Sequence, residues 1–314
     1  MIGYALRRLA VALPIIVIVA CVTFGLVYLM PGDPAAALAG DNATAERIAE
    51  VRHEMGFDRP FFVQFGDWMI SAAQGDFGKS FHFGVPVTDL LAHRMTVTFS
   101  IVIVGWIIAV LIGVPAGLIA GMRPGSITDR IVTGLTTLGI SVPSFWLAMV
   151  LISIFAISLR WFDATGYAPI SDGVGPWLYK LILPGLAVAA TSAADIARQT
   201  RSSVATVVGQ DFIRTNHAMG VKGGSIRLRH VLRNAGIPVA TVAGLQIERL
   251  IGAAVVVELL FAMPGLGDLT LTAVNTQDIP SIQGVVVLVA AIVIVVNLIV
   301  DLSYAWINPK LRKR

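Results

Sequence analysis

The polar residues of this 314-residue chain include the types that enzymes use for acid, base and nucleophilic chemistry, but their spacing matches no catalytic arrangement. His53-Glu54 lacks the second histidine, four residues after the first, that a zinc-binding helix needs. No Gly-x-Ser-x-Gly turn, typical of a serine nucleophile, occurs. The single cysteine, Cys21, can form no intrachain disulfide. We therefore expect no catalytic, metal or cofactor site, and an intramembrane enzyme would have no candidate nucleophile and base.

Gly78-Lys79-Ser80 resembles the end of a phosphate-binding loop. That loop would require glycine at position 73, which is Ala73, and an apolar strand before it, which is absent from the sequence. If ATP drives this protein, another chain is expected to bind and hydrolyse it.

These residues are set in an unusually apolar chain. It is 56% hydrophobic and 13% charged, against about 25% charged in an average soluble domain, and its mean hydropathy is +0.81. The apolar residues are bunched into runs long enough to cross a bilayer, which takes about 20 residues. The sequence therefore predicts an all-α integral membrane protein.

Six transmembrane helices are expected. The first, 9–32, follows two arginines and could be read as a signal peptide, but it is longer than the usual apolar region and no clear cleavage site follows, which favours an uncleaved helix. The other five are expected at 95–122, 131–159, from 181 onward, 235–257 and 279–300.

The predicted organisation has four parts: an N-terminal transmembrane helix (1–32), an extracytoplasmic helical segment (33–94), a five-helix core (95–307) and a basic tail (308–314). The extracytoplasmic segment is expected to hold two small amphipathic helices that pack on the bundle. One carries Ile48, Val51 and Met55 at helical spacing, and the other follows Pro60 with Phe61, Phe62, Phe65, Trp68 and Met69 along one side.

The basic residues predict the orientation in the membrane, because cytoplasmic loops are enriched in Lys and Arg. With the N-terminus inside, 15 of the 23 fall in the cytoplasmic pieces 1–10, 122–130, 198–235 and 308–314. Loops 160–180 and 262–278 hold only Arg160 and Lys180. Both termini are thus expected in the cytoplasm, and the net charge of +4 is explained by topology rather than by nucleic-acid binding.

The cytoplasmic loop 201–237 is polar and basic, between two apolar runs. We expect a helix over roughly 201–214 and another over roughly 225–235, separated by a tight turn at Gly220 and closed by Pro238. Asp211, Arg233 and Asn234 are expected to hold the second piece against the ends of the membrane helices through hydrogen bonds. A merely solvated basic loop is the alternative reading.

Several short motifs recur along the chain. Each motif alone is weak evidence for a family, but their order is specific. They are Pro31-Gly32-Asp33-Pro34, Gly56-Phe57-Asp58-Arg59-Pro60, Gly75-Asp76-Phe77-Gly78-Lys79-Ser80, the loop motif of Asp211, Arg214, Gly220, Ile226, His230, Arg233, Asn234 and Pro238, then Gly244-Leu245-Gln246, Val255-Val256-Val257-Glu258, Pro264-Gly265-Leu266-Gly267, Asp278-Ile279-Pro280, Gln283-Gly284 and Asn297-Leu298-Ile299-Val300-Asp301. The chain resembles the permeases of peptide-type (dipeptide, oligopeptide or nickel) ABC importers, and among them the first of the two permease subunits.

This resemblance implies partners in a bacterial cytoplasmic membrane: a second homologous permease, two ATPase subunits that hold ATP and magnesium, an extracytoplasmic substrate-binding protein, and membrane lipid. Residues near 215–222 would form a coupling helix seated on an ATPase. The residues so implied are Asp211, Arg214, Thr215, Asn216, His217, Ala218, Met219, Gly220, Val221, His230, Arg233 and Asn234. Peptide permeases usually carry basic residues at the positions of His217 and Met219, so the contacts of this chain are expected to differ.

Charged residues inside the predicted fifth span are the candidates for the translocation pathway. Glu248 and Arg249 lie about 15 Å along the helix from Pro238, where a charge costs about 2.5–3.5 kcal/mol and rarely faces lipid. Either they line the path of a peptide, or they form ion pairs with a neighbouring span or the partner permease. Glu258, nearer the outer end, is a third candidate, for which a structural role is the alternative.

Two other classes remain open. A secondary transporter would need intramembrane acidic relays and inverted repeats, and no convincing repeat is found. A membrane scaffold that transports nothing is the other alternative.

Overall fold

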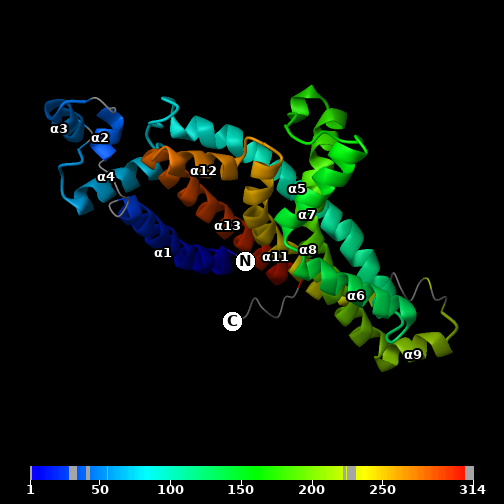
Figure 1. Ribbon diagram of the computed structural model, residues 1–314. Helices are drawn as coiled ribbons and strands as arrows, with labels where there is room; N and C mark the ends of the chain where they lie inside the picture. Colours follow the sequence, from blue (N-terminus) through cyan, green and yellow to red (C-terminus); the bar gives the residue numbers. More distant parts are fainter. Residues whose placement is uncertain are drawn as a thin grey trace. The chain divides into compact units, whose positions relative to one another are not determined.

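The computed structural model describes residues 2–27, 34–39, 43–54, 56–221, 224 and 231–307. As predicted, these residues are helical (Figure 1), and the β pairing within them is limited to an isolated bridge between Lys79 and Pro86. The helices are α1 (Ile2–Val27), α2 (Pro34–Ala39), α3 (Ala45–Glu54), α4 (Phe61–Ala73), α5 (Val87–Gly121), α6 (Ile127–Ser141), α7 (Ser144–Leu151), α8 (Val174–Val208), α9 (Asp211–Ala218), α11 (Leu232–Leu260), α12 (Leu266–Asn275) and α13 (Ile279–Ile307), with a π-helical segment at Ile152–Ser158 and a 3-10 turn at Ile170–Asp172.

Several of these helices are long and apolar enough to cross a bilayer. In the described part of the chain they are α5, α8, α11 and the Ile279–Val300 part of α13. A fifth candidate is a bent pair, α6 with Ser144–Ser158, and α1 contains a shorter apolar stretch, Leu13–Gly25. The multi-pass helical architecture is confirmed, while the count of six spans stays a prediction.

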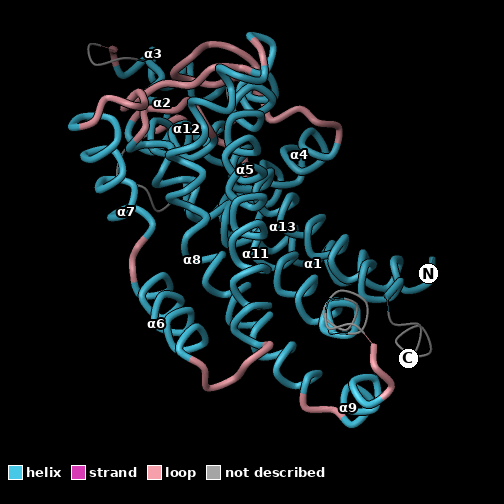
Figure 2. The backbone as a smooth tube through the Cα atoms, turned by 90° about the vertical axis from the view of Figure 1, so that its right-hand side faces the viewer, coloured by secondary structure: helices cyan, strands magenta, loops and turns pink. Residues whose placement is uncertain are grey.

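The run 131–159, predicted as one span, is instead two helices bent by 100°. Figure 2 shows the extended connection between α6 and α7. The break has a local cause: Pro143 disfavours helical backbone at the residue before it, and Val142 adopts the extended values φ −85° and ψ 119°. An apolar pocket of about 340 Å³ lies among α5, α6, α7 and α8, lined by residues such as Ile112, Leu135 and Ala193.

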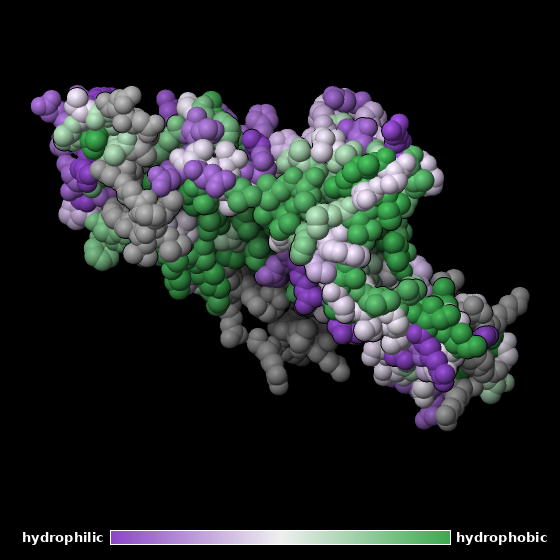
Figure 3. All heavy atoms as spheres, in the orientation of Figure 1, coloured by the Kyte–Doolittle hydropathy of each residue, from purple (hydrophilic) through white to green (hydrophobic). Residues whose placement is uncertain are grey.

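The chain divides into two compact units. Unit 1 comprises Val97–Pro264 and Val296–Arg314 together with Met1, and unit 2 comprises Ile2–Thr96 and Gly265–Val295. The surface of unit 1 over α5 and α7 is mostly apolar (Figure 3). Such a surface is expected for helices that face lipid or other helices rather than water.

Within unit 1, α5 packs on α8 at unusually short range because of glycine. Gly113, Gly117 and Gly121 recur every four residues, and a Cβ atom built on them would lie 2.7, 2.3 and 2.7 Å from carbonyl oxygens of α8. Only glycine fits at that distance. Small residues at four-residue spacing are the usual means by which membrane helices bring their backbones together. The backbones of α5 and α8 are therefore in close contact along this part of unit 1.

Unit 2 is held together by a buried carboxylate. Asp278 is fully buried and accepts hydrogen bonds from the Ser80 hydroxyl, from the Phe81 N–H at 2.9 Å and from the Ser281 hydroxyl at 2.7 Å. The Gly78-Lys79-Ser80 sequence thus ends in a residue that fixes a turn to the start of α13. These bonds compensate the cost of burying the charge.

An aromatic cluster joins α1 to α4, also in unit 2. The ring of Phe24 lies 5.4 Å from Phe61, 5.6 Å from Phe65 and 5.8 Å from Trp68 between centroids. The packing role predicted for these α4 residues is confirmed, except that Phe62 is 83% exposed. The reason is helical geometry, since Phe62 is turned by about 100° from Phe61.

Candidate functional site

The loop predicted to couple this protein to a partner contains a short separate helix. Helix α8 ends at Val208, and α9 begins at Asp211 after a turn at Gly209 and Gln210. The helix predicted for 201–214 is therefore divided, because its first eight residues continue α8. An acidic residue, Asp211, occupies the first turn of α9, where its negative charge interacts favourably with the positive end of the helix dipole.

The end of α9 is a turn that needs glycine. Gly220 has φ +73°, and the Val221 N–H donates to the carbonyl of Asn216 at 3.1 Å, which is the left-handed cap that commonly ends helices. An added Cβ would meet no atom within 4 Å, so the requirement at Gly220 is backbone conformation and not space. The predicted tight turn at Gly220 is confirmed.

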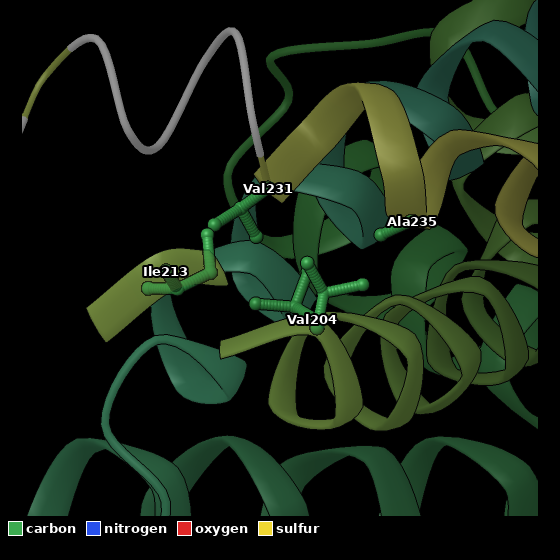
Figure 4. Packing of buried hydrophobic residues seen from close by; sticks show 5 residues of the cluster. Val204, Ile213, Val231 and Ala235 are labelled. Atoms are coloured by element: carbon green, nitrogen blue, oxygen red, sulfur yellow. The ribbon is translucent and has the colours of Figure 1, made fainter. Parts of the chain in front are cut away.

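One side of α9 is anchored in the end of unit 1. Ile213 is buried in a cluster with Val204 and Val207 of α8 and with Val231 and Ala235 at the start of α11. Figure 4 shows Ile213, Val231 and Val204 directed toward one another. Because Leu118 and Met122, at the end of α5, also pack there, α9 is attached to the ends of three spans at once.

The other side of α9 is exposed and partly apolar. Phe212 is 37% and Met219 66% exposed, and Thr215 and Ala218 are exposed as well. The hydroxyl of Thr215 and the amide of Asn216 donate back to carbonyls one turn earlier in α9, at 3.1 and 2.9 Å. A merely solvated loop is not expected to have one side buried in a hydrophobic cluster and apolar side chains exposed on the other.

The remaining predicted loop residues are placed as follows. Arg233 and Asn234 are exposed in the first turn of α11. His230 and the side chains of Arg214 and His217 lie outside the described residues. The prediction that Pro238 closes the second piece is wrong, because α11 continues through it to Leu260. Pro238 is the seventh residue of α11, so the helix continues although the proline lacks the N–H that would donate to the carbonyl four residues earlier.

Of the three pathway candidates, Glu258 is buried. Its side chain is fully buried in α11, and its carboxylate accepts a hydrogen bond from the Thr98 hydroxyl of α5 at 2.6 Å. This bond ties two spans of unit 1 together.

Glu248 and Arg249 lie elsewhere on α11, and both are exposed. Arg249 forms an ion pair with Asp195, which is buried in α8. The second nitrogen donor to Asp195 is Arg198, one turn further along α8, at 3.0 Å. The structure therefore pairs Arg249 with a neighbouring span, one of the two readings that the sequence allowed.

In the part of the chain that the structure describes, no three His, Cys, Asp or Glu side chains gather closely enough to hold a metal ion.

Comparison with known proteins gives the family. Residues 113–313 match the model described as "Binding-protein-dependent transport system inner membrane component", and residues 1–102 match "Binding-prot-dependent transport system membrane comp, N-term". The chain belongs to this family.

Full-length relatives of this inner membrane component are named as permeases of transport systems, and one of them as an ABC transporter permease. The "Probable peptide ABC transporter permease protein y4tP" of Sinorhizobium fredii is 40% identical over 98% of this chain and 99% of its own length. The "Glutathione transport system permease protein GsiC" of Salmonella choleraesuis is 41% identical over 99% of each chain. The "Dipeptide transport system permease protein DppB" of Alkalihalophilus pseudofirmus is 36% identical over 99% of this chain and 100% of its own. The protein is thus a multi-pass permease of an ABC transporter.

The fold of the permease is also found in a solved structure. A chain of the MetNI methionine ABC transporter, in an inward-facing conformation, aligns with a TM-score of 0.56, covering 70% of this chain and 96% of that one at 18% identity. At this identity the likeness establishes the fold alone.

One contact near α9 in the permease was not anticipated from the sequence. Asp129, buried in the first turn of α6, accepts from the Arg201 guanidinium with both carboxylate oxygens and from the Gly125 N–H at 2.8 Å. Ser126 caps the same helix through the Asp129 N–H. The Ser126-x-x-Asp129 spacing is a capping signature visible in the sequence, but Arg201, 72 residues away, is marked there only as one basic residue among many.

Proposed function

We propose that this permease carries di- or oligopeptides, or a related small solute, across the bacterial cytoplasmic membrane, driven by ATP hydrolysis on separate subunits through the loop around Gly220. The substrate class rests on full-length relatives named for peptide, dipeptide and glutathione transport. The proposed complex contains a second homologous permease, two ATPase subunits that bind ATP and magnesium, and an extracytoplasmic substrate-binding protein. Both termini and α9 lie in the cytoplasm, in accord with the distribution of Lys and Arg.

The observation that carries this proposal is the attachment of α9. Ile213 binds it to the ends of α5, α8 and α11, so a force applied to α9 moves three spans together. Phe212 and Met219 are exposed and offer apolar contact area to an ATPase subunit. His217 and Met219 stand where peptide permeases usually carry arginine and lysine, so apolar contact is the main source of affinity on this surface.

The pathway in this proposal runs past the exposed Glu248 and Arg249 and not past Glu258. A charge within a span avoids lipid and faces water or protein. Glu258 is buried against Thr98 and is proposed to maintain the packing of α5 and α11.

The coupling role of Gly220 is tested by Gly220→Val in the complete importer complex. A β-branched residue is strained at positive φ by about 1–2 kcal/mol and would displace the end of α9. We expect ATP-driven uptake of alanyl-alanine to be lost, together with substrate-stimulated ATP hydrolysis, while the amount of permease in the membrane is retained. Gly220→Asn, which tolerates this conformation, should keep most of the uptake.

Gly84→Val is the matched control. Gly84 has φ +69° and, like Gly220, no atom within 4 Å of an added Cβ, but it lies in unit 2. The control should transport almost as well as the unmodified permease. Normal transport by Gly220→Val, or equal losses in the two variants, would show that the turn does not couple ATP hydrolysis to transport.

A further inference from the structure

Three charged side chains of unit 1 meet where α8 lies against α11: Asp195 and Arg198 of α8 and Arg249 of α11. Asp195 lies 13 residues before the end of α8, about 20 Å along its axis, and Arg249 lies 11 residues before the end of α11, about 17 Å. One oxygen of Asp195 accepts from Arg198 at 3.0 Å, and the other accepts from Arg249. Asp195 and Arg249 therefore lie well inside their helices, with Arg198 at the start of the predicted cytoplasmic piece 198–235.

The charges in this cluster do not balance. One carboxylate serves two guanidinium groups, so an excess positive charge remains. The carboxylate is buried, whereas the side chains of Arg198 and Arg249 are 68% and 65% exposed. Each guanidinium uses one nitrogen for Asp195, although it carries five N–H donors in a planar fork. The positive groups thus retain donors on an exposed face formed by α8 and α11.

We propose that Arg198 and Arg249, positioned by Asp195, bind a carboxylate group of the solute as it passes through the permease. This inference rests on the proposed transport function and names the chemical group recognised. A planar carboxylate matches the guanidinium fork, and the excess charge supplies the attraction.

The same geometry keeps the binding weak. A solute carboxylate competes with Asp195 for the two guanidiniums, so it gains contacts only as the ion pairs of Asp195 loosen. Weak, exchangeable binding suits a path that a solute must leave as readily as it enters. The carboxylate of Glu248, exposed one residue before Arg249, repels any nearby anion and so weakens the binding further.

The first test measures uptake of alanyl-alanine and of glutathione, both of which carry free carboxylates, by the complete complex. Arg249→Gln should lower uptake of at least one of them by about tenfold or more, and Arg249→Lys should lose less because it keeps the charge but not the fork. Arg47→Gln, which removes a guanidinium from an exposed ion pair in unit 2, should leave uptake unchanged.

The double variant Asp195→Asn/Arg249→Gln distinguishes recognition from structure. If Arg249 only neutralises Asp195, removing both charges restores uptake. If Arg249 binds the solute, uptake stays low although the buried carboxylate is gone. Restored uptake, or undiminished uptake in Arg249→Gln, would overturn the inference and leave the transport function standing. Failure of the unmodified complex to take up either solute with ATP would overturn both.

A second test is independent of transport. In a Cys21→Ser background, Glu248→Cys places a thiol beside Arg249, and its reaction with an anionic and a cationic methanethiosulfonate of similar size reports the local charge. We expect the anionic reagent to react about tenfold faster, and the ratio to fall toward one when Arg249→Gln is added. A thiol that neither reagent reaches, or a ratio unaffected by Arg249, would contradict an exposed positive site.

Discussion

Two acidic side chains in unit 1 are bound by arginines of α8, but their surroundings differ. Asp129 has one arginine, and its carboxylate also accepts from the Gly125 N–H at the start of α6. Asp195 has two arginines, both mostly exposed. The Asp129 pair is balanced and joins two helices at the end that carries α9. The Asp195 cluster has positive charge left over for something outside the chain.

Two features distinguish charges that stabilise the fold from charges available to a ligand: the number of arginines per carboxylate and the exposure of those arginines. A balanced pair with every oxygen occupied has little left to offer a ligand, so its loss should reduce folded protein. An unbalanced cluster has donors to spare, so its loss should change transport more than abundance. Both sites include residues of α8, and α8 is packed closely against the glycines of α5.

The largest effect is expected from Gly117→Leu, which should disrupt both sites together. An added Cβ at Gly117 would lie 2.3 Å from the Ala197 carbonyl, so the leucine must force α5 away from α8. We expect very little folded permease in detergent extracts, measured by size-exclusion chromatography.

Gly134→Leu is the control for the added side chain. Gly134 is also a helical glycine of unit 1, but it is exposed on α6 and an added Cβ meets no atom within 4 Å. This variant should be extracted in nearly normal amounts. Normal yields of Gly117→Leu would mean that α5 and α8 are not as closely packed as described.

An intermediate effect is expected from Asp129→Ala. The change leaves Arg201 without the carboxylate that holds it and frees the Gly125 turn, so the start of α6 detaches from α8. Folded permease should fall severalfold, with a lower midpoint of thermal unfolding. The double variant Asp129→Asn/Arg201→Gln should recover much of that loss, whereas Asp195→Asn/Arg249→Gln should not recover transport. Equal behaviour of the two double variants would remove the distinction between the sites.

These contacts show which parts of the molecule the sequence reveals. Runs without charge predict the spans, and Gly220 predicts a turn, because both depend on residues close together in the chain. The bend at Val142 was within reach, since the proline that follows is a local signal. The partners of Asp129 and Asp195 were not, because Arg201 and Arg249 lie 72 and 54 residues away and their pairing depends on how the helices pack.

The error at Pro238 has a related cause. A proline predicts the end of a helix, but α11 continues through Pro238, which is flanked by the buried Ala235 and Val239 and is thus held by packing that the local sequence does not show. The divided helix at 201–214 shows the opposite case, since Gly209 and Gln210 mark a turn that the polar composition of the whole segment concealed.

The smallest effect on stability, and the finest test of the comparison, is expected from Arg198→Gln. Arg198 and Asp195 are three residues apart on α8, and pairs at that spacing contribute about 0.2–0.5 kcal/mol. The midpoint of thermal unfolding should therefore change by no more than about 2 °C. Uptake of the carboxylate solutes should still fall, because one of the two exposed guanidiniums is missing. A large drop in stability with normal uptake would instead place Arg198 with Arg201 among the charges that serve only the fold.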